Sequence, residues 1–455
     1  MERRGSAPWN PDRTWADPLI LTLLLAIVLL SGAGLRHRAA AARKPAERVQ
    51  IQGVVADAVL ATPKVLGRLG GVPEPVGRSL QAFTDRDLDG WDKAVLAVHA
   101  AERGEKDLAR DLAKGVPGEV GDLFRAQFAW AYEGAGAPLS VIDAARVRRA
   151  LGEGYAGWIL QARAASRAGA DPAPLEAKAE AWAAPRTMGL LVAGAGLGLL
   201  FLGGLAFMAF LALVRGRPQA PPRYRMGGRA LALVLLAWFA THLVTGQIVG
   251  LLAIPLPFLR PLFLPLSYGL HALLGLAYLC WAEGLGPGDL ARALAPGRHI
   301  PALASAPGFL AVAFTAVAAA NVALAPFMPH GQPPQKELME LLAGTRGPLA
   351  IALTFLTVAV IAPVFEEVLF RGLLLPWLGE RFAPRLGERA GWHLAIIVSG
   401  LAFGLMHMQP LGLPTLGTLG IVLGMAYLRT GNLLTSILVH GLWNGGIFLA
   451  MRFMA

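Results

Sequence analysis

Long runs of apolar residues constrain this 455-residue chain more than any other feature. A helix that crosses a lipid bilayer needs about 20 apolar residues, because each residue advances the helix by about 1.5 Å. About nine runs reach or approach that length: 18–35, 188–214, 230–253, 261–281, 307–327, 347–377, 392–408, 413–428 and 432–451. The sequence therefore predicts an all-α fold, a polytopic transmembrane helical bundle.

The composition supports this prediction and excludes several classes of protein. Hydrophobic residues make up 55% of the chain and charged residues 16%, whereas soluble domains have about 45–50% and about 25%. These values exclude a disordered or wholly soluble protein. The single cysteine, Cys280, excludes an internal disulfide framework and a multi-cysteine metal site. The net charge of +11 forms no basic stripe with interleaved aromatic residues, so no nucleic-acid partner is expected.

One long segment, residues 36–186, separates the first apolar run from the others. It carries 22 basic and 19 acidic residues, the mixed charge of a water-exposed surface. Within it, the apolar spacing of residues 91–114 predicts a helix, punctuated by Gly104 and Gly115. We expect four parts: a cytoplasmic N-terminus with a transmembrane anchor (1–35), a helical, repeat-like soluble domain (36–186), transmembrane helices (187–344) and a transmembrane core (345–455).

Arginine placement predicts the orientation in the membrane. Five arginines lie between residues 215 and 229, and three between 379 and 391. Short loops rich in Lys and Arg stay in the cytoplasm, so both loops are expected there. Counting spans backwards places the N-terminus inside and residues 36–186 outside. We expect a multi-pass protein of the bacterial inner membrane whose first span is retained as an anchor.

Charged residues interrupt the run that begins at residue 347. Glu366 and Glu367 are adjacent, and Arg371 follows. A charge at the bilayer centre costs about 2.5–3.5 kcal/mol, so these groups are expected to face a protein interior or a water-filled cavity. Arg371 is four residues after Glu367, a spacing that predicts an ion pair on one helix face. Glu366 points elsewhere, and a desolvated carboxylate without a nearby cation suits a general base.

Two later runs contribute further polar side chains. Gly400 and Gly404 form a small-residue face that admits another helix closely, and His407 ends that run. His440 and Asn444 are four residues apart and therefore share one helix face. Each of these polar side chains alone could hydrogen-bond a carbonyl or hold helices together. Together with the glutamates they could hold and deprotonate a water molecule, with or without zinc.

These residues form three ordered motifs that resemble a known family. EExxxR includes Glu366, Glu367 and Arg371; FxxxH includes Phe403 and His407; HxxxN includes His440 and Asn444. The ordered set resembles the CPBP intramembrane proteases, which include the CAAX prenyl-protein endopeptidases and the bacteriocin-processing and immunity proteins. The resemblance extends over roughly residues 345–450. The N-terminal anchor and the large segment 36–186 depart from the compact form of the family.

The resemblance implies peptide-bond hydrolysis within the membrane, acting on membrane-associated proteins or peptides. It implies that Glu366 activates a water held by His407, with Glu367 and Arg371 in the same site. His440 and Asn444 would be metal ligands or oxyanion stabilisers. Zinc and metal-free catalysis both remain open. If zinc is used, its ligands would come from a set of four residues: Glu366, His407, His440 and Asn444. The sequence contains no HExxH motif.

Two other functions remain open at this point. A non-catalytic scaffold or immunity protein of the same family would retain the motifs, and a proton-coupled carrier also uses buried Glu and His residues. The expected partners are membrane lipids, a protein or peptide substrate, and a protein that binds the segment 36–186. Three other histidines, His271, His330 and His393, are isolated and are expected at interfaces or in loops.

Overall fold

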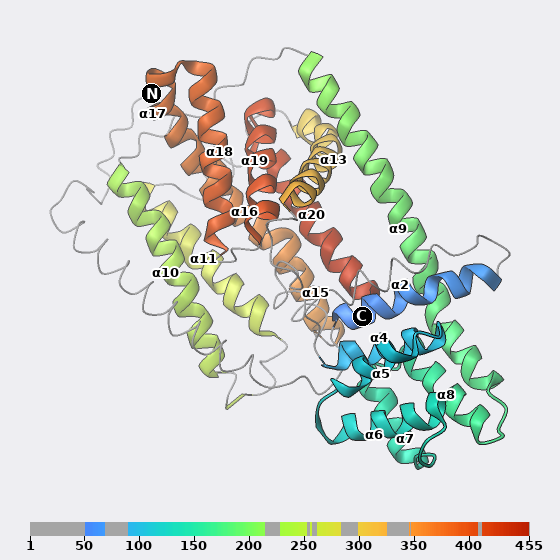
Figure 1. Cartoon of the computed structure of the whole chain (residues 1–455). Helices are drawn as coiled ribbons and strands as arrows, with labels where there is room; N and C mark the ends of the chain where they lie inside the picture. The colour runs from blue at the N-terminus through green and yellow to red at the C-terminus, as the bar shows by residue number, and fades with distance from the viewer. Residues whose placement is uncertain are drawn as a thin grey trace. The chain divides into compact units, whose positions relative to one another are not determined.

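The computed structural model describes residues 51–68, 90–213, 228–252, 255–256, 262–283, 299–324, 345, 347–407 and 412–454. These residues are almost entirely helical and include no β-strand (Figure 1). They divide into two compact units. One contains residues 51–197 with the last residues of the chain, and the other contains residues 198–324 and 345–449. The prediction of an all-α fold is confirmed.

The first unit is built from short helices around one apolar core. Its helices are α2 (Ile51–Arg68), α4 (Gly90–Glu102), α5 (Lys106–Lys114), α6 (Gly118–Phe128), the π-helix η1 (Ala129–Glu133), α7 (Val141–Ala150), α8 (Tyr155–Arg167) and the first part of α9 (Ala173–Leu213). Trp91 and Phe124 are fully buried in this core, with ring centroids 6.1 Å apart. The single helix predicted over 91–114 is two helices, because Gly104 adopts a φ of +82° that ends α4.

A buried polar cluster joins three helices of this unit. Asp57 of α2 accepts hydrogen bonds from His99 of α4, at 2.7 Å, and from the backbone N–H of Ala156, at 3.0 Å. Ala156 lies in the first turn of α8, where backbone N–H groups lack intrahelical partners. The Asp57 carboxylate therefore satisfies the start of one helix while it fixes the imidazole of another.

A second charged cluster surrounds Glu102 at the end of α4. Its carboxylate accepts hydrogen bonds from Lys64 at 3.0 Å, Arg163 at 2.8 Å and Tyr132 at 3.0 Å. Burial alone would raise the pKa of Glu102, but the bonds and charges of Arg163 and Lys64 outweigh it and lower the pKa to about 2. Glu102 is therefore ionised in the folded unit across most of the acidic range.

Acidification from about pH 4.5 to pH 2 is expected to destabilise this unit. Glu102 titrates near 4.5 when unfolded and near 2 when folded, so its contribution is complete above pH 4.5 and disappears as pH falls through 2. We expect a contribution of about 2 kcal/mol, because Lys64 and Arg163 are partly exposed and solvent screens them. Hydrogen exchange within α4 in urea should show wild type and Glu102→Gln converging at pH 2. A difference that stays constant with pH would contradict this assignment.

The second unit contains helices that are apolar enough to cross a membrane. Among the described residues of the whole chain, five helices have the necessary length and composition: Ala173–Leu213, Leu303–Leu324, Pro348–Leu386, Glu388–Met406 and Leu433–Arg452. Val234–Val249 and Phe263–Tyr278 are shorter apolar helices. The chain is thus an integral membrane protein, and the predicted polytopic bundle is confirmed.

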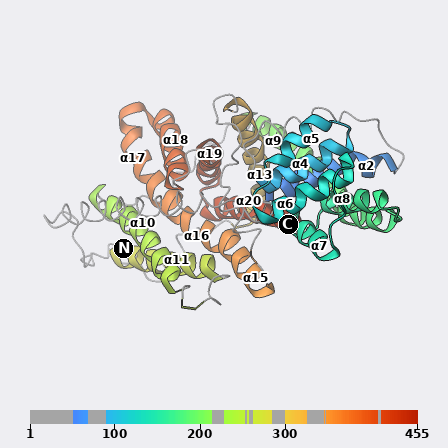
Figure 2. The ribbon, with the colours of Figure 1, turned by 60° about the horizontal axis from the view of Figure 1, so that its bottom comes forward.

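Eight of the nine predicted apolar runs coincide with helices, whereas run 18–35 lies outside the described residues. The helices of this unit are the last part of α9, α10 (Gly228–Leu252), α11 (Phe263–Glu283), α13 (His299–Leu324), α15 (Pro348–Leu356), α16 (Ala362–Glu367), α17 (Leu375–Leu386), α18 (Glu388–Met406), α19 (Leu413–Thr430) and α20 (Leu433–Met454). Helix α18 packs between α17 and α19, and α10 pairs with α11 (Figures 1 and 2).

The helix that carries the glutamate pair contains two π-helical segments. Residues 348–386 form one continuous helix, in which η4 (Thr357–Ile361) and η5 (Val368–Leu374) flank α16. A π segment has wider i→i+5 hydrogen bonding, shifts the helix register and is frequent at functional sites. Glu366 and Glu367 therefore lie on a short α-helical piece between two shifts of register.

Helices α18 and α19 cross with their backbones in contact. A Cβ atom built on Gly400 would lie 2.6 Å from the backbone nitrogen of Ile421, and one built on Gly420 would lie 2.7 Å from the Gly400 carbonyl oxygen. At Gly404 the corresponding distance is 2.9 Å, to the nitrogen of Gly417. Real Cβ atoms do not approach other atoms this closely, so the crossing requires glycine. The close approach predicted from Gly400 and Gly404 is confirmed.

Candidate active site

Glu367 and Arg371 form a fully buried ion pair. Arg371 Nη1 lies 2.7 Å from Glu367 Oε1, one helical turn away as the sequence spacing predicted. Arg371 Nη2 donates to the Gly420 carbonyl oxygen on α19, at 2.7 Å, and the guanidinium lies 4.7 Å from the centroid of the Phe403 ring on α18. The arginine thus links the glutamate helix to α18 and α19.

His440 of α20 lies between the two glutamates. Its Nδ1 is 3.0 Å from Glu367 Oε1, the oxygen that also accepts from Arg371. Its Nε2 is 3.8 Å from Glu366 Oε2. The ring is almost completely buried and packs edge-to-face on Phe403, with centroids 5.4 Å apart. The structure therefore brings together four predicted site residues from two helices.

Glu366 is buried, and its two oxygens have different surroundings. Oε1 accepts a hydrogen bond from the Tyr268 hydroxyl on α11. Oε2 has no hydrogen-bond partner among the described residues. Only this second oxygen faces His440. The carboxylate thus has one oxygen fixed by a tyrosine and one directed towards an imidazole nitrogen.

His407 lies at the end of α18 and is half-buried. Its Nδ1 donates to the carbonyl oxygen of Phe403, at 2.8 Å. The Phe403 ring contacts both histidines, with centroids 4.9 Å from His407 and 5.4 Å from His440. His407 is therefore a neighbour of the cluster through an aromatic ring, and its direct bond goes to its own helix.

Asn444 connects α20 to the π segment before the glutamates. Its Nδ2 donates to the carbonyl oxygen of Val358 in η4, at 3.1 Å. In a π segment the backbone carbonyl oxygens do not all accept the i→i+4 hydrogen bonds of an α-helix. A side chain that donates to one of them therefore stabilises the segment. Gly441 lies beside this contact, because a Cβ there would be 2.4 Å from the Ala359 carbonyl oxygen. One amide hydrogen of Asn444 thus holds the two helices together, and the other remains for a second acceptor.

Three further residues lie around Glu366 and belong to none of the three motifs. Tyr268 contacts it directly, and the rings of His242 and His271 lie 6.0 Å and 5.4 Å from the Tyr268 ring. The description of His271 as isolated is wrong: it is fully buried in α11, where it contacts rings of α10 and α16, so it lies at a helix interface and not in a loop. His271 follows Tyr268 by three residues within an apolar run, a spacing that predicts that the two side chains share one helix face. His393 is exposed, and His330 lies outside the described residues.

The donor set does not form a three-ligand metal site. Among the described residues, no three His, Cys, Asp or Glu side chains gather closely enough to hold a metal ion. Glu366 and His440 are close together. The bond of His407 uses Nδ1 and leaves Nε2 as a possible ligand, and the bond from Asn444 to Val358 uses the amide nitrogen and leaves the amide oxygen. These bonds are therefore compatible with either a metal ion or a water molecule held by protein groups.

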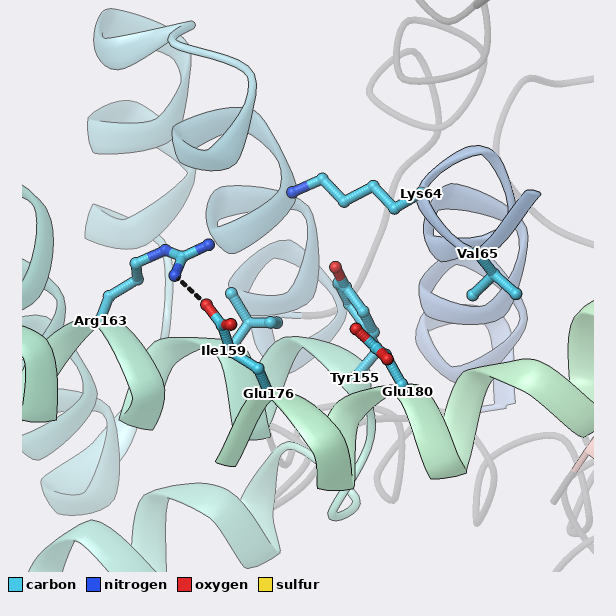
Figure 3. Close-up of a pocket in the computed structure, with 7 residues that line it drawn as sticks. All are labelled: Lys64, Val65, Tyr155, Ile159, Arg163, Glu176 and Glu180. Atoms are coloured by element: carbon cyan, nitrogen blue, oxygen red, sulfur yellow. Dashed lines mark hydrogen bonds and ion pairs between the residues drawn. The ribbon is translucent and has the colours of Figure 1, made fainter. Parts of the chain in front are cut away.

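The first unit contains a cavity of about 260 Å³ that is lined by seven residues, Lys64, Val65, Tyr155, Ile159, Arg163, Glu176 and Glu180 (Figure 3). Its charged groups bond to one another. Arg163 pairs with Glu176 at 2.5 Å and with Glu102 at 2.8 Å, and Lys64 also pairs with Glu102. This charge network stabilises the unit, and the acid–base cluster of the second unit remains the candidate active site.

Comparison with known proteins finds relatives of part of this chain. An Escherichia coli protein described only as an uncharacterized 24.3 kDa protein is 32% identical over 110 residues, which are 24% of this chain and 48% of that protein. The membrane-embedded CAAX protease MroQ of Staphylococcus aureus is 32% identical over 93 residues, which are 20% of this chain and 36% of that protein. The chain therefore spans half or less of the length of these relatives. No solved structure matches.

A family model matches one C-terminal segment of the chain. It describes type II CAAX prenyl endopeptidases of the Rce1-like kind and matches residues 348–446. The match contains all three motifs and every predicted site residue from Glu366 to Asn444. Residues 348–446 of this membrane protein thus match the Rce1-like family model, and the resemblance to the CAAX and CPBP proteases is confirmed as a similarity of that segment.

Proposed function

We propose that the protein is an intramembrane endopeptidase in which Glu366 is the general base. The observation that carries the proposal is the buried pair of Glu366 Oε2 and His440 Nε2, 3.8 Å apart. A single water molecule can hydrogen-bond both atoms at this separation. The match to prenyl endopeptidases supports peptide hydrolysis, and the helices around the pair are long enough to place it within the bilayer.

The hydrogen bonds of His440 determine which of its nitrogens carries the proton. The Glu367 carboxylate oxygen accepts from Arg371, so we assign the donor role in the 3.0 Å contact to His440 Nδ1. In the neutral ring Nε2 is then an acceptor. A water between Nε2 and Glu366 Oε2 donates one hydrogen to each and directs a lone pair towards a peptide carbonyl.

The remaining steps follow from the same groups. Glu366 takes the proton as the water attacks the carbonyl carbon, and returns it to the leaving amine when the C–N bond breaks. The tetrahedral intermediate needs a hydrogen-bond donor for its oxyanion. Asn444, on the same face of α20 as His440, retains one amide hydrogen beyond its bond to Val358 and is assigned this role. His407 borders the site through Phe403 and is assigned to substrate or water positioning.

Removal of divalent metal is expected to leave this activity unchanged. Of the two alternatives that the motifs leave open, we propose the metal-free one, because no three His, Cys, Asp or Glu side chains among the described residues gather closely enough to hold a metal ion. The purified full-length protein should be dialysed against a zinc chelator and assayed, with a zinc metalloprotease in the same detergent as the control. Loss of activity that returns with stoichiometric zinc would contradict the metal-free assignment and support zinc.

The proposal is tested by comparing cells that express wild type with cells that express Glu366→Gln. Quantitative analysis of new protein termini among membrane and secreted proteins should reveal cleavage sites that disappear in the variant. These sites would identify substrates, which we propose are membrane-associated proteins or peptides. If no terminus depends on Glu366, the protein is a non-catalytic scaffold of the same family.

We also propose a location and an outer partner. The proposed location is the bacterial inner membrane, and the cationic loops support an orientation with residues 36–186 on the extracytoplasmic side. The helical unit there is proposed to bind a protein, because its core and charge networks make it an independent folded body.

A further inference from the structure

Among the described residues, Tyr268 is the polar contact to Glu366 that comes from outside the family-matched segment. Helix α11 precedes residue 348 by more than 60 positions, and neither α10 nor α11 falls within the matched residues. Both helices nevertheless pack against the glutamate helix: α11 contacts α16 and η4, and α10 contacts η5. The α10–α11 pair is therefore a part of the site that the family motifs do not include.

The Tyr268 ring is held by aromatic neighbours. The His271 ring is perpendicular to it at 5.4 Å, and the His242 ring lies at 6.0 Å with an angle of 65°. His271 also packs edge-to-face on Phe365, with centroids 5.2 Å apart, and Phe365 is adjacent to Glu366 in sequence. Such ring contacts favour fixed perpendicular geometries. The hydroxyl of Tyr268 is thus directed at Glu366 by a set of rings in which His271 and Phe365 are buried and His242 is half-buried.

We propose that Tyr268 is a positioning residue that selects which oxygen of Glu366 meets the water. Its hydroxyl donates to Oε1 and so fixes the rotation of the carboxylate. Oε2 is then the oxygen that faces His440 Nε2. The inference rests on the proposed function, because Tyr268 acts only through Glu366 and contacts no reacting atom itself.

Loss of the hydroxyl is expected to affect the chemical step more than substrate binding. Without the Tyr268 donor, the carboxylate samples other rotations, and small errors in the position of a reacting group cost large factors in rate. We expect Tyr268→Phe to lower kcat by about 10- to 100-fold with KM within about twofold, because the ring and its packing are retained. A general loosening of the site would instead raise KM as well.

The assay uses the full-length protein in lipid vesicles. Its probe is a quenched fluorescent peptide copied from the strongest Glu366-dependent cleavage site found in cells. Tyr278→Phe is the matched control, since it removes the same hydroxyl from the same helix ten residues away. It is expected to retain wild-type kcat and KM. The thermal unfolding midpoint of each variant shows whether it is folded.

A double-mutant cycle gives an independent readout. Glu366→Asp has a shorter side chain that no longer reaches the Tyr268 hydroxyl, so Tyr268→Phe should cause less than a twofold further loss in that background. Full additivity of the two changes would overturn the inference. It would also be overturned if Tyr268→Phe keeps wild-type kcat while Glu366→Gln is inactive, a result that leaves the proposed function intact. If neither variant affects any cleavage, the proposed function itself fails.

Discussion

Replacing Glu366 by glutamine is expected to lower the rate of substrate cleavage by about 10²–10⁴-fold, the usual contribution of a general base. Glutamine has the same shape and can still accept a hydrogen bond from Tyr268. Its amide, however, cannot take a proton from the water held against His440. The change therefore removes the chemistry and retains the contact that positions the side chain.

The measurement is the initial rate of cleavage of the peptide probe by purified protein at equal concentrations of folded protein. Glu380→Gln, a change of the same kind on the same long helix, is the control and is expected to retain full activity. Comparable activity of Glu366→Gln and wild type would exclude Glu366 as the base. The scaffold alternative would then be preferred over hydrolysis.

Replacing Arg371 by methionine is expected to reduce the free energy of unfolding by about 3–5 kcal/mol, the usual cost of leaving one partner of a buried ion pair unpaired. Arg371 and Glu367 are both fully buried, and the guanidinium also donates to the Gly420 carbonyl. Methionine fills part of the space but supplies no hydrogen-bond donor. Among the described residues, Glu367 would then retain His440 as its donor, and the Gly420 carbonyl would lose its side-chain donor.

The double variant Glu367→Gln with Arg371→Met distinguishes charge from packing. It removes both charges, so we expect it to recover part of the lost stability. Unfolding midpoints in detergent, with the fraction of monodisperse protein, provide the measurement. Arg381→Met is the control, because Arg381 donates only to the Trp377 carbonyl one turn away on the same helix. If Arg371→Met is as stable as that control, the buried pair does not stabilise the bundle.

The sequence predicted contacts that depend on local spacing. The Glu367–Arg371 pair follows from a separation of four residues in a helix, and the close approach at Gly400 follows from two small residues one turn apart. The helical prediction over 91–114 was correct, and the chain divides into two helices at Gly104, one of the two glycines that the sequence marks as punctuation.

The contacts that were missed join distant parts of the chain. Tyr268 and Glu366 are 98 residues apart, and no motif links them. The same holds for Asn444 and Val358, whose hydrogen bond depends on a π segment that shifts the helix register. Such contacts are determined by how helices pack in three dimensions. The sequence shows only that a polar residue within an apolar run needs a buried partner, and it does not identify that partner.

Helix α19 contributes no acid or base to the site, yet its backbone constrains the evolution of the site. The carbonyl oxygen of Gly420 accepts a hydrogen bond from Arg371, and the backbone of Gly420 also contacts the backbone of Gly400. Any side chain at position 420 would push the two helices apart and withdraw the carbonyl from the guanidinium. We therefore expect protein variants to tolerate exchange of apolar side chains along the outer surface of α19 far more readily than a single added methyl group at Gly420.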